Sequence, residues 1–103
     1  MIKNHQENFV TVMGIDPGLA TTGYGIIRSN GRDHEVLQAH YLKTSPKINH
    51  FERLHYIFTE INNLMIQYHP KEVAIESQFV SKNVRSAISV AEARTVAVLA
   101  ASM

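Results

Sequence analysis

Two acidic residues in this chain stand where a reaction centre could form. Asp16 ends an apolar run over residues 9–15, and Glu76 ends a second run over residues 73–75. The first run suits a strand covered on both faces, and the second suits a short buried strand. The carboxyl end of a strand is where open α/β sheets build their sites. Two carboxylates held close together repel each other unless a cation lies between them. The pair therefore predicts a divalent-metal site.

The stretch after Asp16 has the composition of a tight turn. Pro17 fixes its own backbone and holds Asp16 extended, and we expect Gly18 to adopt a positive φ. Thr21 and Thr22 then begin a second segment that favours a strand. An ordinary turn explains all of these residues equally well, so the stretch alone does not decide between turn and site.

Four strands and two helices are expected to position the two acids. The expected strands cover residues 8–16, 22–29, 34–42 and 73–76, and the expected helices cover 51–68 and 84–103. Asn30-Gly31 predicts a hairpin, so the first three strands should form an antiparallel meander. Two strands joined through a helix usually run parallel in one sheet, at a spacing of ~4.8 Å. Asp16 and Glu76 would then face each other at one edge.

The two expected helices differ in their patterns. The first has apolar residues at every third or fourth position, Asn49 and Glu52 resemble a capping box, and Pro70 ends it. The second is apolar all round beyond Thr95, so we expect that end to be buried. Its expected core side holds Val84, Ala87, Ile88, Ala91, Val98 and Leu99.

Bulk composition indicates one folded domain, residues 1–103. The chain has a net charge of +1 and no cysteine, which excludes disulfide scaffolds and thiolate metal sites. Residues 1–8 are polar, and we expect them to be a flexible N-terminus. No apolar run approaches the ~20 residues of a membrane span, so we expect a cytoplasmic protein.

The segment after Glu76 has a weak basic bias. Its charged residues are Lys82, Arg85, Glu92 and Arg94. Phe79, in the expected loop, could stack on a nucleic-acid base, while Lys82 and Arg85 could contact phosphates. The alternative is a buried loop phenylalanine beside two solvated cations.

Taken together, these motifs resemble the RuvC family, the bacterial Holliday-junction resolvases (crossover junction endodeoxyribonucleases). The opening stretch over residues 14–27, G-I-D-P-G-L-A-T-T-G-Y-G-I-I, resembles the family's first motif almost residue for residue. Four further segments match in order and spacing: T-S-P-K at 44–47, E-R-L at 52–54, V-A-I-E at 73–76 and F-V-S-K-N-V-R-S-A at 79–87. The resemblance extends from about residue 9 to the last residue.

The resemblance implies an α/β, RNase H-like fold. The family's mixed sheet has three antiparallel strands, a helix, a parallel fourth strand, a second helix and a fifth strand. The fifth strand and the C-terminal helix have no counterpart in this chain, so we expect a truncated domain. The family also implies homodimers that nick two strands of a four-way DNA junction with Mg²⁺ or Mn²⁺, and a branch-migration complex as partner.

Matching positions carry the family's roles onto individual residues. Asp16 and Glu76 correspond to the first two catalytic carboxylates, with Asp16 between two metal ions. Phe79 matches the aromatic residue that inserts at the junction centre, and Lys82, Asn83 and Arg85 fall in the DNA-facing segment.

This chain departs from the family in two places. Residues 91–95 read A-E-A-R-T where the family has G-Q-A-R-G, which puts close helix packing or dimer contact in doubt. The family's third and fourth ligands, an acidic pair near its C-terminus, are absent, so we expect weak metal binding and poor or no cleavage. Two alternatives stay open: a non-catalytic junction-binding or dimerisation module, and half of an actin- or sugar-kinase-like phosphotransferase, whose phosphate loop Asp16, Gly18 and Thr21 loosely imitate.

Overall fold

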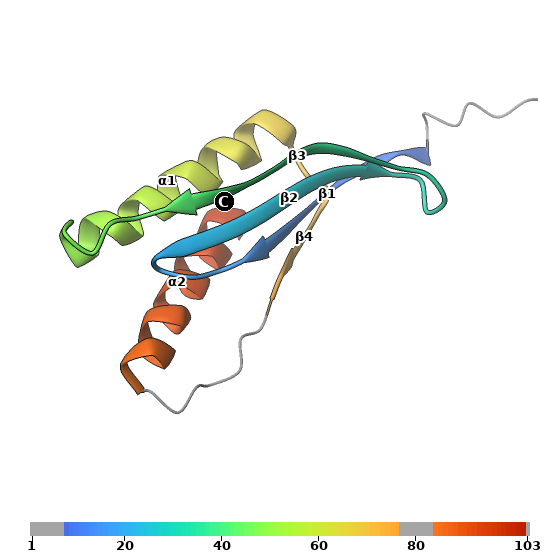
Figure 1. Ribbon diagram of the computed structural model, residues 1–103. Coiled ribbons are helices and arrows are strands. Elements are labelled where there is room, and N and C mark those ends of the chain that lie inside the picture. Colours follow the sequence, from blue (N-terminus) through green and yellow to red (C-terminus); the bar gives the residue numbers. More distant parts are fainter. Residues whose placement is uncertain (1–7, 77–83, 103) are drawn as a thin grey trace, which may run out of the picture.

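A four-stranded sheet and two helices make up the part of the chain that the computed structural model describes, residues 8–76 and 84–102 (Figure 1). The elements, in chain order, are β1 (Val10–Asp16), β2 (Thr21–Ser29), β3 (His34–Lys43), α1 (His50–Tyr68), β4 (Glu72–Ile75) and α2 (Val84–Ser102). The strands lie in the order β3-β2-β1-β4. Each predicted element is present, with ends displaced by no more than two residues at the described boundaries.

The first three strands form the predicted antiparallel meander. β1 pairs with β2 from Val10 opposite Ser29 to Asp16 opposite Gly23, and β2 pairs with β3 along its whole length. In the loop between β2 and β3, the side chain of Asn30 accepts the N–H groups of Arg32 and Asp33. Gly31 has a φ of 91°, which a residue with a side chain rarely adopts.

β4 lies beside β1 and parallel to it, as predicted from the strand–helix–strand order. The register runs from Val12 opposite Glu72 to Ile15 opposite Ile75. The chain reaches this position through α1, which Asn49 caps by accepting the N–H of Phe51 at 2.9 Å. α1 ends where His69 takes a left-handed conformation and donates its N–H to the carbonyl of Met65.

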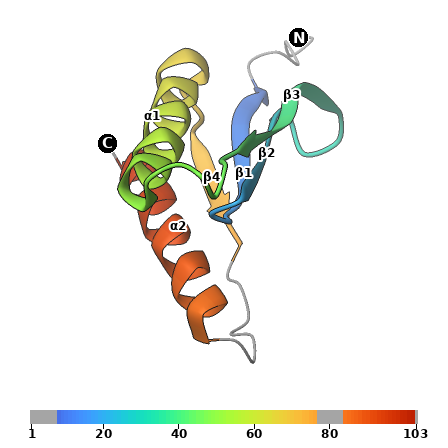
Figure 2. The same ribbon diagram turned by 60° about the vertical axis from the view of Figure 1, so that its left-hand side comes forward.

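Both helices pack on the same face of the sheet (Figure 2). Met13 and Ile15 of β1 point to that face and are buried, whereas Gly14 and Asp16, which alternate with them, are exposed. The expectation that β1 is covered on both faces is therefore wrong for the described residues, and β4 is likewise only half-buried. Because alternate residues of a strand point to opposite faces, one apolar run supplied both a core face and an open face.

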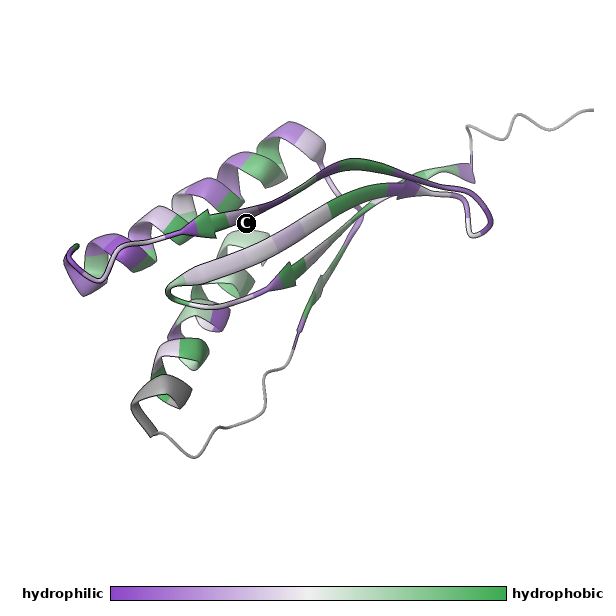
Figure 3. Ribbon diagram, viewed as in Figure 1, coloured by the Kyte–Doolittle hydropathy of each residue, from purple (hydrophilic) through white to green (hydrophobic). Residues whose placement is uncertain are grey.

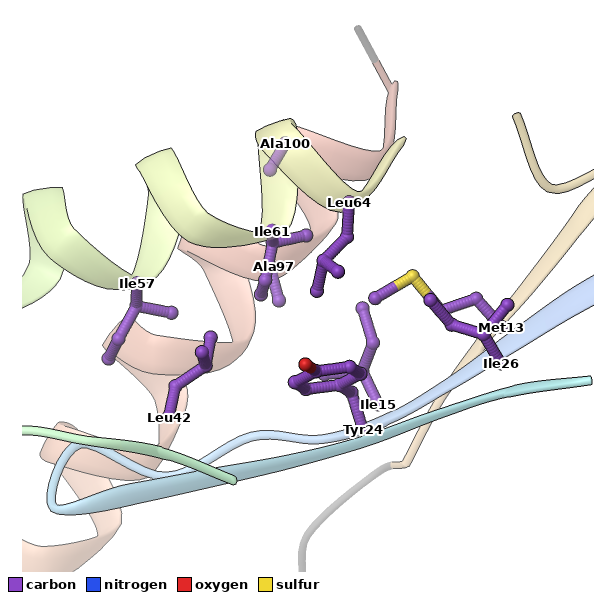
Figure 4. Close-up of a cluster of buried hydrophobic side chains, with 10 residues drawn as sticks. All are labelled: Met13, Ile15, Tyr24, Ile26, Leu42, Ile57, Ile61, Leu64, Ala97 and Ala100. Atoms are coloured by element: carbon purple, nitrogen blue, oxygen red, sulfur yellow. The ribbon is translucent and has the colours of Figure 1, made fainter. Parts of the chain in front are cut away.

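The hydrophobic core lies between the sheet and the helices (Figure 4). Side chains from three strands meet side chains from both helices; they are Met13, Ile15, Tyr24, Ile26, Leu42, Ile57, Ile61, Leu64, Ala97 and Ala100. Burial raises the pKa of the Tyr24 hydroxyl, and charge on Tyr68, Glu60 and Tyr56 raises it further. Full burial of each large aliphatic side chain contributes about 1.5–3 kcal/mol.

α2 turns a different side to the core from the one predicted. Its buried residues are Ala93, Ala97 and Ala100, while Ile88 and Leu99 are each 54% exposed. Small side chains let α2 approach α1 closely, and this packing decided the orientation over bulk hydrophobicity. Glu92, one of the departures from the family motif, has its Oε1 3.0 Å from Nε2 of His50 in α1.

Neither helix in the described part is long and apolar enough to cross a membrane.

Truncation of a core side chain of α1 should be far more costly than truncation of an exposed one on the same helix. Ile61 is fully buried and Ile66 is 60% exposed. Ile61→Ala should lower the free energy of unfolding by about 2–5 kcal/mol, because it removes buried methyl groups and leaves a cavity. Ile66→Ala should change it by less than about 1 kcal/mol. Urea denaturation of both variants tests this, and equal losses would contradict the core described above.

Candidate functional site

Asp16 and Glu76 lie side by side at the carboxyl ends of two parallel strands. The register places Ile15 opposite Ile75, and the N–H of Glu76 donates to the carbonyl of Ile15 at 2.9 Å. Both acids are exposed and belong to the open face of the sheet, away from the helices. The structure therefore brings together the two acids that the sequence singled out, in the arrangement that it predicted.

A shallow hollow of about 430 Å³ lies on the open face next to the two acids. Its floor is made of residues with little or no side chain, namely Gly14, Gly23, Gly25 and Ala74. At Gly14 and Gly25 an added Cβ would meet no atom within 4 Å. The first part of β2, which contributes Gly23 and Gly25 to this floor, is neither strongly apolar nor strongly polar (pale in Figure 3). A ligand can therefore approach the backbone of the sheet beside the carboxylates.

The turn after Asp16 is held by a buried threonine. Thr22 is fully buried; its hydroxyl donates to the carbonyl of Gly18 at 2.6 Å and accepts the N–H of Gly18 at 3.2 Å. Gly18 does not have the positive φ that was expected. Glycine fits there for a different reason, because a Cβ would collide with the carbonyl oxygen of Thr21. The tightness of the turn, rather than its handedness, is what requires glycine.

A second set of contacts joins the same turn to the first helix. Thr44 donates its N–H to the carbonyl of Ala20 at 3.0 Å and its hydroxyl to the carbonyl of Leu19. The Nε–H of Arg53 in turn donates to the Thr44 hydroxyl at 2.9 Å. The T-S-P-K and E-R-L segments thus meet, and they anchor the turn that follows Asp16. Sequence reasoning noted these motifs but missed this role, since only the fold brings them together.

The donor chemistry of the two acids fits a hard divalent cation. Carboxylate oxygens are ligands that Mg²⁺ and Mn²⁺ prefer, and an open hollow leaves room for water and phosphate oxygens to complete the coordination. Within residues 8–76 and 84–102, no group of three or more His, Cys, Asp and Glu side chains could hold a metal ion. The described part of the chain therefore supplies two carboxylates and no third.

The remaining predicted site residues cannot be placed in this geometry. Phe79, Lys82 and Asn83 lie outside the described residues, between β4 and α2. Arg85 belongs to the first turn of α2, and its side chain is outside the described part as well. Their assignment as DNA contacts stays a prediction from the sequence.

Comparison with known proteins is consistent with this geometry. Residues 12–103 match the family model described as crossover junction endodeoxyribonuclease RuvC. The chain belongs to the RuvC family. It is 46% identical over 89 residues to the RuvC of Treponema denticola, which covers 86% of this chain and 50% of that relative. It is 45% identical over 89 residues to the RuvC of Caldicellulosiruptor saccharolyticus, covering 85% of this chain and 54% of the relative.

Solved RuvC structures share the fold. A structure of Thermus thermophilus RuvC in complex with a Holliday junction substrate superimposes with a TM-score of 0.84 at 30% identity, covering 89% of this chain and 56% of the other. A second Thermus thermophilus RuvC structure gives a TM-score of 0.79. The predicted RNase H-like mixed sheet, with three antiparallel strands and a parallel fourth, is confirmed. This chain spans about half the length of the RuvC relatives that it matches.

Loss of the Thr22 hydroxyl should destabilise the turn beside Asp16. Thr22→Val keeps the shape of the side chain but leaves the N–H and carbonyl of Gly18 without their partner, so the free energy of unfolding should fall by about 1–3 kcal/mol. Thr22→Ser retains the hydroxyl and serves as the control, with a smaller loss for its missing methyl group. Thermal unfolding followed by circular dichroism measures both. If the valine variant is the more stable of the two, the hydroxyl does not hold the turn.

Proposed function

We propose that this chain carries part of the active site of an endonuclease that resolves four-way DNA junctions by hydrolysing phosphodiester bonds. The observation that supports it most is the adjacency of Asp16 and Glu76 at the ends of parallel strands in a RuvC-family fold. A relative of known structure has been solved in complex with a Holliday junction substrate. Family membership favours this function over the phosphotransferase alternative.

The proposed roles follow from the chemistry of the two side chains. Asp16 and Glu76 would hold Mg²⁺ or Mn²⁺, with two ions in a complete site. When bound, these ions supply positive charge that offsets the charge developing on the attacking, phosphoryl and leaving oxygens. The glycine-lined floor would admit the DNA backbone close to the sheet. The turn held by Thr22 and Thr44 would fix the position of Asp16.

DNA recognition is proposed for the segment after β4. Phe79 would stack on bases opened at the junction centre, while Lys82, Asn83 and Arg85 would contact the phosphate backbone. This segment connects β4, which carries Glu76 at its end, to α2. The segment begins directly after Glu76 in the sequence.

Because the described residues bring only two carboxylates together, we expect this chain to bind DNA without efficient cleavage. In a labelled-DNA assay, the chain should bind a four-way junction in Ca²⁺ more tightly than a matched linear duplex. Cleavage in Mg²⁺ or Mn²⁺ should be weak or absent. Asp16→Asn should abolish any cleavage, because it removes a proposed metal ligand. Binding measured without divalent cations should not weaken, because the substitution removes a negative charge that repels phosphate.

Three outcomes of this assay separate the candidate functions. Junction-selective binding without nicking supports the non-catalytic binding module for this length of chain. Paired nicks that disappear in Asp16→Asn show that two carboxylates suffice or that a second subunit supplies the others. Equal affinity for junction and duplex contradicts the proposed function. Phe79→Ala, run alongside, tests the proposed stacking role.

A homodimer is proposed as the working form, because two symmetric nicks need two sites. The outer side of α2 supports a contact between copies, since Ile88, Val98 and Leu99 are exposed there. Ala91 and Thr95, which replace the two family glycines, are exposed too. The replacement of the two glycines therefore leaves the packing of α2 on the core intact, and it changes the proposed dimer surface instead.

A branch-migration complex as partner and a cytoplasmic location stay predictions from the sequence.

A charge on the outer side of α2 should separate the proposed dimer. Leu99→Glu buries a carboxylate at the contact, and the dissociation constant should rise by roughly tenfold or more. Phe51→Glu is the matched control, because Phe51 is a large apolar residue of α1 that is 75% exposed. Analytical ultracentrifugation measures both variants. A dimer weakened by Phe51→Glu and not by Leu99→Glu would place the contact on α1 instead.

A further inference from the structure

Tyr41 is a large aromatic residue on the open face of the sheet, away from the hydrophobic core. It is 60% exposed and lies near the end of the edge strand β3, within the paired part of the sheet rather than in a loop. The register pairs it with Gly23 of β2, which pairs on its other side with Asp16 of β1. Tyr41, Gly23 and Asp16 therefore form one row across three strands.

The missing side chain of Gly23 leaves the space between Tyr41 and Asp16 open. A Cβ built on Gly23 would lie 3.4 Å from Cε1 of Tyr41 and 3.8 Å from Cβ of Asp16. The tyrosine ring and the aspartate thus flank the same point, and one edge of the ring, Cδ1 and Cε1, lies against Gly23. A side chain at position 23 would separate them.

A second hollow, of about 330 Å³, is lined by Tyr41 together with Ala39 and His40 of β3. Both hollows include Asp16, Gly23 and Tyr24 in their lining. The two hollows are therefore neighbours on the open face, with Glu76 lining the first, Tyr41 lining the second and Asp16 lining both. A phosphate beside the two acids would leave the neighbouring sugar and base within reach of the tyrosine ring.

We propose that Tyr41 is a nucleotide-contacting residue of the active site, and that its ring packs on the sugar or base next to the phosphate held at Asp16 and Glu76. This inference rests on the proposed function and adds a residue that positions the DNA strand. Aromatic rings bind nucleotides in this manner with little regard to sequence, since every base has a π-face. An aromatic ring two strands from the acids would fix the direction in which the strand crosses the sheet.

A single tryptophan can report this contact, because the chain contains none. Tyr41→Trp places an indole in the row with Asp16. Tyr56→Trp is the control: Tyr56 is 42% exposed but lies on α1, which packs on the other face of the sheet. Each variant is titrated in Ca²⁺ with a fluorescein-labelled four-way junction, and DNA binding and tryptophan emission are recorded in the same series.

The proposal expects junction-dependent quenching of the tryptophan at position 41 and little change at position 56. Tyr41→Phe should keep the affinity within about twofold, whereas Tyr41→Ala should weaken it by roughly tenfold at an unchanged melting temperature. Junction binding without quenching at position 41, or with equal quenching at both positions, overturns the role of Tyr41 and leaves the proposed function standing. Absence of junction-selective binding in the unmodified chain overturns both.

Discussion

The parallel pairing of β1 with β4 is the constraint on which the candidate site depends. It sets the register that ends with Ile15 opposite Ile75, and the next residue on each strand is an acid. Asp16 and Glu76 are 60 residues apart in the sequence, so the pair exists only because β1 and β4 are neighbours in the sheet. The core enforces this register, since a shift of one residue would turn Met13 and Ile15 out of the core and point Asp16 into it. Apolar packing on one face thereby positions charge on the other.

Much of this arrangement can be predicted from local signals. The apolar runs, Asn30-Gly31 and the helical periodicity ending at Pro70 each reflect chemistry contained in a few consecutive residues. The strand–helix–strand order then gives the parallel pair, because few other connections are possible. The prediction that the two acids lie side by side thus needed only the order of the elements along the chain and the parallel direction of the two strands.

The parts that the sequence did not reveal depend on contacts between distant segments. The anchoring of the turn by Thr44 and Arg53 joins three elements, and no local pattern indicates it. The core side of α2 was mispredicted because hydrophobicity favoured Ile88 and Leu99, whereas close approach to α1 favoured Ala93 and Ala97. Gly18 was assigned a left-handed backbone when steric room was the actual requirement. Tyr41 gave no signal at all, because an exposed tyrosine in a strand is ordinary until its neighbours are known.

The long separation along the chain between the two acids has a consequence for the order of folding. The hairpins of β1, β2 and β3 need only short loops to close. β4 is separated from β1 in the sequence by β2, β3 and α1, so their pairing has to close a much longer loop. An intermediate with only the hairpins formed would contain Asp16 without its partner. Any cation affinity that arises from the pair must then appear late, together with the docking of α1 and β4. Metal binding by the pair would therefore report the docking of β4 beside β1.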